Sequence, residues 1–550
     1  MKIALAQLNY HIGNFELNTQ KIINAVAEAK QQKADLVVFS ELAICGYPPL
    51  DLLDKQWFIE ETGRALNIIQ LHCTDIAVVI GAPSINSGEN GKRLFNSAYV
   101  IDNGIIKKVI NKTLLPTYDV FNETRYFESN QKFDTVEING ILIGITICED
   151  IWHEQANSQR YTKVKLYKNN PLDQLAQLNP ALILNLSASP YSYYQENRRI
   201  DVLQRNAQNY GLPFIYVNQV GVNSDLIFDG ASTVVNAKGE IVLQLKSFEE
   251  ELKIINFDRI NKTRPIEYAF DNIVEKNRQA IVFGVREFFN KNGFKKAVLG
   301  LSGGLDSALV ATLATEALGA ENVTGILMPS EYSSDHSVTD ALELAKNLGI
   351  KHHIIPIKSI FHPFLDALHP VFNNLPFGLT EENLQARIRG TILMAYSNKH
   401  GHILLNPSNK SEMAVGYSTM YGDMNGALSV IGDIYKTEVF AMAKLINKHK
   451  EIIPTHIITK PPSAELRPDQ KDSDSLPDYD ILDKILFNFI ERQLSANDIV
   501  EMGYNPKVVE RIIKLVNNSE FKRFQAPPIL RVSSKAFGQG RQMPLVAKYE

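Results

Sequence analysis

The sequence predicts an α/β protein of two domains. The first is a sandwich of two packed sheets with helices outside, and the second is a doubly wound parallel sheet. The chain has 550 residues, whereas a single hydrophobic core stops growing at roughly 250–300 residues. The first half contains many short apolar runs of strand length and few helical patterns, which favours two packed sheets. The second half alternates strands with helices, which is typical of a parallel sheet.

The composition excludes several classes of protein. The chain is 45% hydrophobic and 21% charged with a net charge of −4, as expected of a soluble globular protein without a nucleic-acid partner. Cys45, Cys73 and Cys148 are too few for a disulfide framework, which predicts a reducing cytoplasm. Residues 1–7 carry one positive charge and no long apolar run, so a signal peptide is not expected. No apolar run reaches about 18 residues, so no membrane segment is expected.

Apolar patterns predict the elements of the first half in order. Residues 3–8 alternate as a strand, residues 17–33 form an amphipathic helix, and residues 35–39 form a buried strand that ends at Ser40-Glu41. Further strands are predicted at residues 76–81, 97–101, 105–111, 140–147, 182–186 and 214–218. Residues 231–236 and 241–245 flank a glycine turn, which predicts a hairpin.

A polar stretch at residues 257–267 contains a proline and lacks periodicity, which indicates a boundary. We therefore expect domains at residues 1–258 and 272–550, joined by a linker at 259–271. A helix is predicted from Asn272 to Asn292, with Glu275 as a capping signal and Gly293 as its stop. Strands at 297–301, 323–328 and 350–357, with helices after the first and at 336–348, complete the predicted alternation.

Three polar residues stand at the ends of predicted strands in the first half. They are Glu41 in Phe39-Ser-Glu-Leu-Ala43, Lys112 in Asn111-Lys-Thr-Leu-Leu-Pro116, and Cys148 in Ile147-Cys-Glu-Asp-Ile-Trp152. Taken singly, they would be a solvated glutamate, a surface lysine and a buried inert thiol. Taken together, in order and local sequence, they resemble the Glu-Lys-Cys set of the nitrilase superfamily over about residues 1–260. The resemblance implies an α-β-β-α sandwich and amide hydrolysis through a thioester.

This chemistry requires these residue types. A thiol must lose its proton to attack an amide, and a neighbouring ammonium group favours the thiolate. Glu41 can take that proton and later deliver it to the leaving ammonia. Lys112 and the Glu149 N–H can stabilise the tetrahedral oxyanion.

The surrounding sequence resembles the glutaminase branch of this superfamily. That resemblance implies that Glu123 is a second glutamate near the nucleophile, although it could instead pair with Arg125. It also implies that the glutamine pocket contains Tyr118 and Ser189. The branch usually has a lysine or arginine six residues after this serine, where this chain has Gln195. Arg198 or Arg199 could replace the missing cation.

A glycine-rich stretch in the second half joins a predicted strand to a helix. Ser302-Gly-Gly-Leu-Asp-Ser307 can point backbone N–H groups at an anion. It lacks the Gly-Lys-Ser/Thr ending of a Walker A loop, and a plain helix–strand packing turn is the alternative. The stretch resembles the PP-loop of the N-type ATP pyrophosphatases, which are adenine-nucleotide α-hydrolase folds. The resemblance implies that ATP is bound by Gly300, Leu301, Ser302, Gly303, Gly304, Leu305, Asp306 and Ser307.

Further motifs extend the resemblance to nearly the whole chain. They are residues 328–337, 382–389, 409–412, 421–423 and 476–479. With the N-terminal half, they resemble the glutamine-dependent NAD synthetases. This implies that deamido-NAD, ATP and glutamine are converted to NAD, AMP, pyrophosphate and glutamate, and that the chain forms homo-oligomers, either dimers of synthetase domains or octamers.

The resemblance also implies particular roles in the second half. Asp306 and Glu412 would hold Mg²⁺, and Lys436 would neutralise phosphate charge. The family usually has Thr-Gly where this chain has Pro407-Ser408, and Ser408 could replace the threonine at ATP. A mobile loop over the site is expected at residues 460–478. Deamido-NAD would contact Asn383, Arg387, Glu412, Asp423 and Lys522.

Two other functions remain open. One is a different PP-loop glutamine amidotransferase, although no His-x-Glu follows Cys148 and residue 2 is lysine rather than cysteine. The other is a non-enzymatic ATP-binding sensor fused to an inactive nitrilase fold. The presence of Glu41, Lys112 and Cys148 argues against the sensor.

Overall fold

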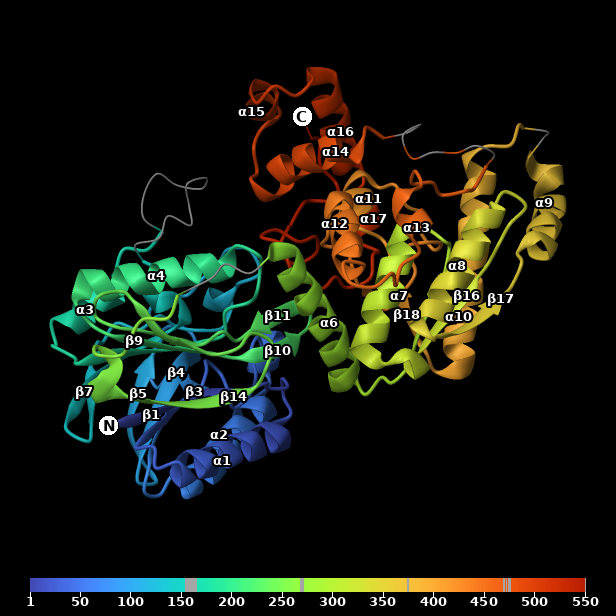
Figure 1. The fold of residues 1–550 in the computed structure, drawn as a ribbon. Coiled ribbons are helices and arrows are strands. Elements are labelled where there is room, and N and C mark those ends of the chain that lie inside the picture. Colours follow the sequence, from blue (N-terminus) through green and yellow to red (C-terminus); the bar gives the residue numbers. More distant parts are fainter. Residues whose placement is uncertain are drawn as a thin grey trace. The chain divides into compact units, whose positions relative to one another are not determined.

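The computed structural model describes residues 1–153, 166–267, 272–372, 375–467, 470, 472 and 476–549. The chain forms two compact units, Met1–Phe270 and Asp271–Glu550 (Figure 1). The predicted linker stays a prediction, and its residues 268–271 lie outside the described residues. Its first residues, 259 and 260, belong to the short helix α5 (Phe257–Ile260). No helix within the described residues is long and apolar enough to cross a membrane.

Unit 1 contains two six-stranded sheets. Their strand orders are β14-β1-β2-β3-β4-β5 and β13-β12-β9-β8-β7-β6. The first sheet comprises β1 (Lys2–Gln7), β2 (Leu36–Val38), β3 (Ala77–Ile85), β4 (Leu94–Asp102), β5 (Ile105–Asn111) and β14 (Glu251–Asn256). The second comprises β6 (Thr135–Ile138), β7 (Ile141–Ile147), β8 (Leu182–Ser187), β9 (Phe214–Asn218), β12 (Thr233–Val235) and β13 (Ile241–Gln244). The other strands and α-helices described before α5 are the hairpin β10 (Val220–Asn223) and β11 (Leu226–Asp229), and α1 (Phe15–Gln31), α2 (Gln56–His72), α3 (Pro171–Ala176) and α4 (Gln195–Tyr210).

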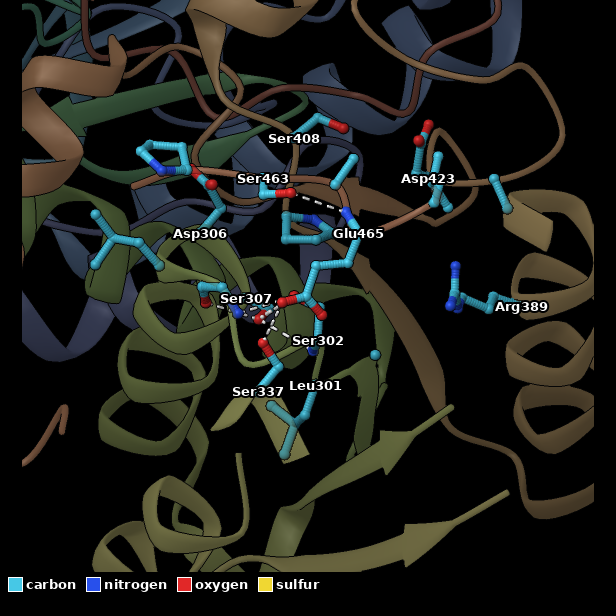
Figure 2. Close-up of a pocket in the computed structure, with 18 of the residues that line it drawn as sticks. Leu301, Ser302, Asp306, Ser307, Ser337, Arg389, Ser408, Asp423, Ser463 and Glu465 are labelled. Atoms are coloured by element: carbon cyan, nitrogen blue, oxygen red, sulfur yellow. Dashed lines mark hydrogen bonds between the residues drawn. The ribbon is translucent and has the colours of Figure 1, made fainter. Parts of the chain in front are cut away.

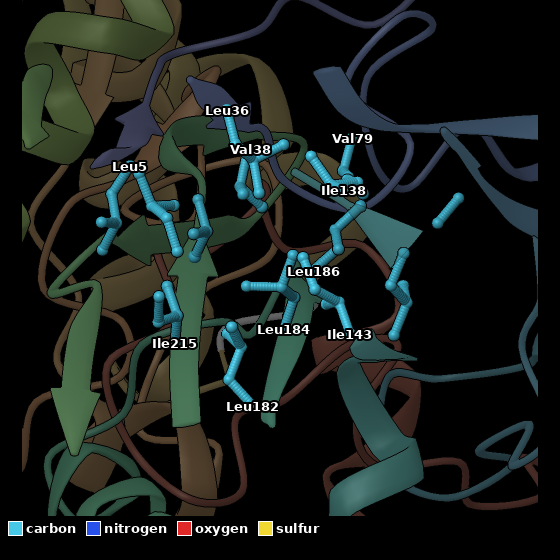
Figure 3. Close-up of a cluster of buried hydrophobic side chains, with 14 of the residues drawn as sticks. Leu5, Leu36, Val38, Val79, Ile138, Ile143, Leu182, Leu184, Leu186 and Ile215 are labelled. Atoms are coloured by element: carbon cyan, nitrogen blue, oxygen red, sulfur yellow. The ribbon is translucent and has the colours of Figure 1, made fainter. Parts of the chain in front are cut away.

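Strand alternation explains the layers of this sandwich. Successive side chains of a strand point to opposite faces of its sheet. Leu5 therefore joins the core between the two sheets, together with Val38, Leu184 and Ile215 (Figure 3). Its neighbour Ala4 joins a second cluster, which is formed with α1 and α2 on the outer face. A third cluster packs α4 on the outer face of the other sheet, so the predicted α-β-β-α sandwich is confirmed.

Local backbone chemistry moves several predicted boundaries. The helix α1 begins two residues earlier than predicted because the Asn14 side chain accepts a hydrogen bond from the Leu17 N–H. It ends before Lys33, whose φ of 59° lies in the left-handed region. Ala231 has a φ of 50°, so β12 begins only at Thr233. The sequence pattern missed β14, which pairs antiparallel with β1.

Unit 2 is built on one five-stranded sheet of order β17-β16-β15-β18-β19, and every pair of neighbours is parallel. Its strands are β15 (Ala297–Gly300), β16 (Val323–Leu327), β17 (Lys351–Ile354), β18 (Ile403–Asn406) and β19 (Leu428–Ser429). The order reverses between β15 and β18, and ligands of doubly wound sheets bind outside the strands' carboxyl ends at such a switch point. The glycine-rich stretch directly follows β15.

Helices flank this sheet and form a C-terminal bundle. A hydrophobic cluster joins α9 and α10 to β15, β16 and β18, and α14 and α16 pack together in another. The helices are α6 (Ile273–Asn292), α7 (Leu305–Leu318), α8 (Asp335–Leu348), α9 (Lys358–Phe372), α10 (Leu379–His400), α11 (Lys410–Val415), α12 (Lys436–Ile446), α13 (Thr455–Thr459), α14 (Tyr479–Leu486), α15 (Ala496–Glu501), α16 (Pro506–Asn518) and α17 (Glu520–Arg523).

The expected capping of α6 is half right. The Asn272 side chain accepts from the Val274 N–H, and Gly293 stops the helix with a φ of 70°. Glu275 does not close a capping box, because its carboxylate accepts hydrogen bonds from the guanidinium of Arg278. The strand predicted at residues 350–357 ends at Ile354, before a proline that cannot donate to the ladder.

A buried lysine ties α11 to a segment much later in the chain. The ammonium group of Lys410 lies 2.9 Å from Asp433 and from Glu491, and it donates to the Ser533 hydroxyl at 2.7 Å. Asp433 also accepts from the backbone N–H groups of Val532 and Ser533. Because all three charged groups are buried, loss of Lys410 would leave two buried carboxylates without their cation.

Candidate active sites

The three strand-end residues of unit 1 form one buried cluster. Lys112 Nζ donates to Glu41 Oε1 at 2.7 Å and to Glu123 Oε1 at 2.9 Å. Glu41 and Lys112 are 0% exposed, so the solvated and surface alternatives are wrong. Arg125 pairs with Asp51, so the alternative partner for Glu123 is wrong as well. Burial alone would lower the pKa of Lys112, but Glu123 and Glu41 outweigh it and raise that pKa.

Cys148 follows β7 directly and begins a 3-10 turn at Cys148–Ile151. It is 7% exposed and its φ is 43°, a strained backbone conformation of the kind found at functional sites. Burial and the charge of Glu41 raise the pKa of its thiol well above the usual value, while Lys112 opposes that rise. Cys148 therefore carries a neutral thiol close to a carboxylate that could take its proton.

Sequence reasoning missed the residues that hold this cluster in place. Asp150 Oδ1 accepts from the N–H groups of Thr113 and Leu114, and its Oδ2 accepts from Ile147 N–H. The turn after Lys112 and the strand before Cys148 are thus joined through one carboxylate. Asn96 donates to Glu41 at 2.7 Å. Asp150 lies in the motif around Cys148, but a motif alone does not reveal what its side chain holds.

Two tyrosines donate hydrogen bonds to the carboxylate of Glu149, the residue that follows Cys148. The hydroxyl groups of Tyr118 and Tyr167 both donate to Glu149 Oε1, at 3.0 and 2.9 Å. Burial raises the pKa of Glu149 to about 7, although both tyrosines act against that rise. Tyr118 therefore lies beside Glu149, and its role in a glutamine pocket stays a prediction. The sequence did not indicate the Glu149 side chain as a candidate.

Ser189 and Gln195 lie on the segment after β8. The N–H of Ala188 donates to Glu41 Oε2 at 3.1 Å, which places the neighbouring Ser189 beside the cluster. Ser189 is buried, and its N–H donates to Asn218. Gln195 is half-buried at the start of α4. Within the described residues, no hydrogen bond joins its side chain to the cluster.

Arg199 already has a partner. It is buried and forms a bidentate ion pair with Asp229. One of the two hydrogen bonds runs from the guanidinium group to Asp229 Oδ1 and is 2.8 Å long. Arg198 is exposed on the same helix. Two arginines were candidates to replace the missing glutamine-binding cation. Because Arg199 is paired with Asp229, Arg198 is the remaining candidate.

Alanine variants of the two arginines should behave differently. Arg199→Ala leaves Asp229 buried without its partner, so unfolding free energy should fall by about 3–5 kcal/mol in a urea titration. Arg198→Ala should change stability by less than about 0.5 kcal/mol but raise KM for glutamine more than about twofold. If KM stays within that factor, Arg198 does not bind the glutamine carboxylate.

The glycine-rich stretch of unit 2 borders a cavity of about 330 Å³ at the switch point of the sheet (Figure 2). The cavity is lined by ends of β15, β16 and β18, by α10, and by residues 460–466. The predicted site residues that line it are Gly300, Leu301, Ser302, Gly304, Leu305, Asp306, Ser307, Ser408, Glu412, Asp423 and Lys436. Of the predicted mobile loop, residues 468, 469, 471 and 473–475 lie outside the described residues.

The loop itself is tightly folded. Gly303 has a φ of 78°, and a Cβ there would lie 2.2 Å from the carbonyl oxygen of Ser337, so only glycine fits. The hydroxyls of Ser302 and Ser307 lie 3.0 Å apart, and Ser302 also accepts from the Gly304 N–H. The loop thus packs against the first turn of α8.

An acidic pair in the cavity shares one lysine. The ammonium group of Lys436 contacts Asp306 and lies 3.4 Å from Glu412. Asn409 links the two carboxylate-bearing segments by donating to Asp306 and accepting from the Glu412 N–H. Burial raises the pKa of Glu412 to about 8, although the positive charge of Lys436 acts to lower it. Among described residues there is no metal-suited group of three or more His, Cys, Asp or Glu side chains.

The remaining predicted residues surround one loop, residues 416–423. Asn383 accepts from the Thr419 hydroxyl, and Arg387 donates to the Met420 carbonyl. Lys522 donates to the carbonyls of Gly416 and Ser418. Asp423 lines the cavity and accepts from the Thr419 N–H. Three of these residues form hydrogen bonds with the loop: Asn383, Arg387 and Lys522. They are not among the residues that line the cavity.

Four charged cavity residues were not predicted as site residues: Arg389, Lys460, Glu465 and Asp472. Arg389 belongs to the motif at 382–389, and it lines the cavity where its neighbour Arg387 does not. It donates to the Met328 carbonyl at 3.0 Å, and burial lowers its pKa to about 10. Lys460 and Glu465 line the cavity from a stretch that the sequence predicted only as a mobile loop.

Residues 2–265 match the carbon-nitrogen hydrolase family and residues 277–526 match the NAD synthase family. These matches define a two-domain ligase with an amide-hydrolysing unit and a synthase unit. The chain belongs to the glutamine-dependent NAD(+) synthetases. It is 48% identical to the enzyme of that name from Synechocystis sp., over 100% of this chain and 99% of the relative. The Acinetobacter baylyi enzyme is 43% identical over 99% and 98% of the two chains.

A solved structure agrees with this assignment. It is that of the glutamine-dependent NAD+ synthetase from Acinetobacter baumannii in complex with adenosine diphosphate. It is 41% identical to this chain, covers 99% of this chain and 98% of its own, and has a TM-score of 0.78.

Proposed function

We propose that this enzyme forms NAD from deamido-NAD, with ATP activating the nicotinate carboxylate and glutamine supplying ammonia. The observation that carries the proposal is the buried Glu41–Lys112–Cys148 cluster in a chain that also holds the glycine-loop cavity. ATP is the nucleotide substrate. We also propose that the enzyme is a cytoplasmic homo-oligomer, which sedimentation would test.

In unit 1, the Cys148 sulfur attacks the glutamine amide carbon while its proton passes to Glu41. Lys112 and the Glu149 N–H stabilise the oxyanion that forms. The carbon–nitrogen bond then breaks, and Glu41 returns the proton to the departing ammonia. Water hydrolyses the remaining thioester to glutamate, with Glu41 again accepting a proton.

The Glu149 carboxylate provides the recognition of glutamine in this proposal. It is buried, and its described hydrogen-bond donors are two neutral tyrosine hydroxyls. A buried carboxylate with only neutral donors has no positively charged partner, and the α-ammonium group of glutamine would be that partner. Ser189 would contact the substrate from the neighbouring segment.

Glu149→Gln should therefore raise KM for glutamine about 30-fold, which corresponds to about 2 kcal/mol for a lost charge-assisted hydrogen bond. Burial raises the pKa of Glu149 to about 7, so protonation below pH 7 removes the charge that holds the ammonium group. For the wild type, kcat/KM for glutamine should fall below pH 7, and this component should disappear in Glu149→Gln. The control is Glu137→Gln, exposed on β6. An unchanged pH profile in Glu149→Gln would refute this role.

In unit 2, the deamido-NAD carboxylate attacks the α-phosphorus of ATP and pyrophosphate leaves. Ser302, Ser307 and the loop N–H groups would hydrogen-bond the departing pyrophosphate, and Lys436 would neutralise part of its charge. Ammonia then attacks the acyl carbon and AMP leaves. Deamido-NAD would be held by Asn383, Arg387, Glu412, Asp423 and Lys522, after rearrangement of the contacts that some of them make with loop 416–423.

The residues of the cavity suit Mg²⁺. It usually binds one or two protein carboxylates together with phosphate oxygens and water, and Asp306 and Glu412 already converge on one cation, the ammonium group of Lys436. They would hold Mg²⁺, which when bound would supply charge neutralisation to the phosphates. Ser408 lines the cavity and would replace the missing threonine.

The decisive experiment measures NAD, AMP and pyrophosphate with deamido-NAD, ATP and either glutamine or ammonium. Equal amounts of the three products support the proposal. ATP binding without AMP release would instead support the sensor function, and amidation of a different carboxylate would support another amidotransferase.

A further inference from the structure

Residues 460–466, which we term the strap, run from α13 along the nucleotide cavity. Their side chains and backbone line it together with the glycine loop (Figure 2). The Leu466 carbonyl at the far end of the strap accepts from Gln385 on α10 at 2.9 Å. The strap is thus anchored at that end, and the remaining question is what holds its middle.

Glu465 fastens the strap to the first turn of α8. Its Oε1 accepts from the Ser337 hydroxyl at 2.7 Å, among the dashed lines near Ser337 in Figure 2. The same oxygen accepts from the Ser334 hydroxyl at 2.8 Å. Its Oε2 accepts from the Ser334 N–H at 3.3 Å. A carboxylate at a helix N-terminus is also favoured by the helix dipole. These three hydrogen bonds account for both oxygens of the carboxylate.

Lys460 makes a second attachment at the same turn. Its ammonium group lies 3.1 Å from the Ser337 hydroxyl and 3.1 Å from Asp340 Oδ2. Asp340 also contacts His456 on α13 at 2.8 Å. The Ser337 hydroxyl therefore accepts a hydrogen bond from Lys460 and donates one to Glu465. Both attachments meet at this one residue.

The attachment holds a backbone conformation that would otherwise be disfavoured. Glu465 has a φ of 49°, and residues other than glycine occupy the left-handed region at a cost in free energy. The same turn of α8 contacts the glycine loop. The backbone of Ser337 lies so close to residue 303 that only a glycine fits there. Ser337 thus touches both the strap and the loop expected to hold ATP.

We propose that Glu465 and Lys460 are positioning residues that fasten the strap to α8, and that the fastened strap sets the affinity for ATP and the rate of nucleotide release. They act through the strap and not on the reacting atoms. The inference rests on the proposed function only in naming ATP as the nucleotide.

The test compares Glu465→Ala and Lys460→Met with Glu343→Ala, an exposed position on the same helix α8. Binding of a non-hydrolysable ATP analogue is measured by calorimetry, and hydrogen exchange is measured at the amides of Lys460 and of residues 463–466. We expect Glu465→Ala and Lys460→Met each to weaken analogue binding about tenfold and to speed exchange of the strap, with Glu343→Ala matching the wild type. KM for ATP should rise while kcat changes less, because lid contacts act on binding and release. Glu465→Gln, which keeps an acceptor for the serine hydroxyls, should recover part of the affinity.

Unchanged analogue affinity in Glu465→Ala, or unchanged exchange of the strap, would overturn the proposal. Weaker binding in Lys460→Met without faster exchange would mean that Lys460 contacts the nucleotide directly, and would overturn its positioning role. If Glu465→Ala fails to fold by circular dichroism, Glu465→Gln and Lys460→Met decide the question. Failure of the wild type to make NAD would refute the proposed function, whereas analogue binding and exchange would still decide the role of the strap.

Discussion

Replacing Cys148 by alanine should abolish NAD synthesis from glutamine and preserve synthesis from ammonium added at high concentration. Removing the nucleophile of a covalent mechanism commonly lowers turnover about a millionfold. The cysteine cluster and the glycine-loop cavity lie in separate units, so the second active site keeps its residues in this variant. The assay is the rate of NAD formation with each nitrogen source.

Cys73→Ala is the matched control, because Cys73 is also a buried thiol and its SH group donates to the Ile69 carbonyl. It should retain both activities. If Cys148→Ala is folded yet still uses glutamine, Cys148 is not the nucleophile and the inert-thiol interpretation holds. If the folded variant loses both activities, the two units do not work as independent modules.

Asp306→Asn should abolish synthesis from either nitrogen source, by about a thousandfold or more, as losses of electrostatic stabilisation commonly do. A carboxylate in a phosphate-binding loop repels the phosphates unless a cation lies between them. Asparagine keeps the size and the hydrogen-bonding reach of the side chain but cannot hold Mg²⁺ in the same way. The contact with Lys436 would weaken, but that lysine keeps Glu412 as a partner.

The rate should be measured over a range of Mg²⁺ concentrations. A shift of the Mg²⁺ requirement to higher concentration supports the assignment, and Asp366→Asn, exposed on α9, should behave as the wild type. Normal turnover from ammonium in Asp306→Asn would refute the role of Asp306 as a magnesium ligand.

The sequence predicts elements well where a buried apolar run has turn residues at both ends. The strand at 105–111 and the stop of α6 at Gly293 are correct to the residue. The edge strand β14 was missed because its residues are only partly buried, so no clear alternation of apolar and polar side chains marks it. Its place in the sheet is fixed by pairing with β1, a partner some 250 residues away, which local patterns do not reveal.

The candidate site was predictable in residue type and less so in orientation. Glu41, Lys112 and Cys148 could be named because each follows a strand in a distinctive local sequence. Asp150 and the carboxylate of Glu149 could not, because their importance depends on backbone and tyrosine donors that only folding brings together. Arg387 and Arg389 are two residues apart on one helix, and the helix phase decides which of them lines the cavity.

The ion-pair network around Lys410 has a consequence for biosynthesis. Residues 1–256, including the cysteine cluster and the closing strand β14, leave the ribosome well before Ser533, which Lys410 and Asp433 require in order to be satisfied. At about 5–20 residues per second, the interval is on the order of tens of seconds. On every translating ribosome the ammonia-producing unit can thus be complete before the unit that consumes ammonia, and for that interval glutamine hydrolysis by the nascent chain would yield no NAD.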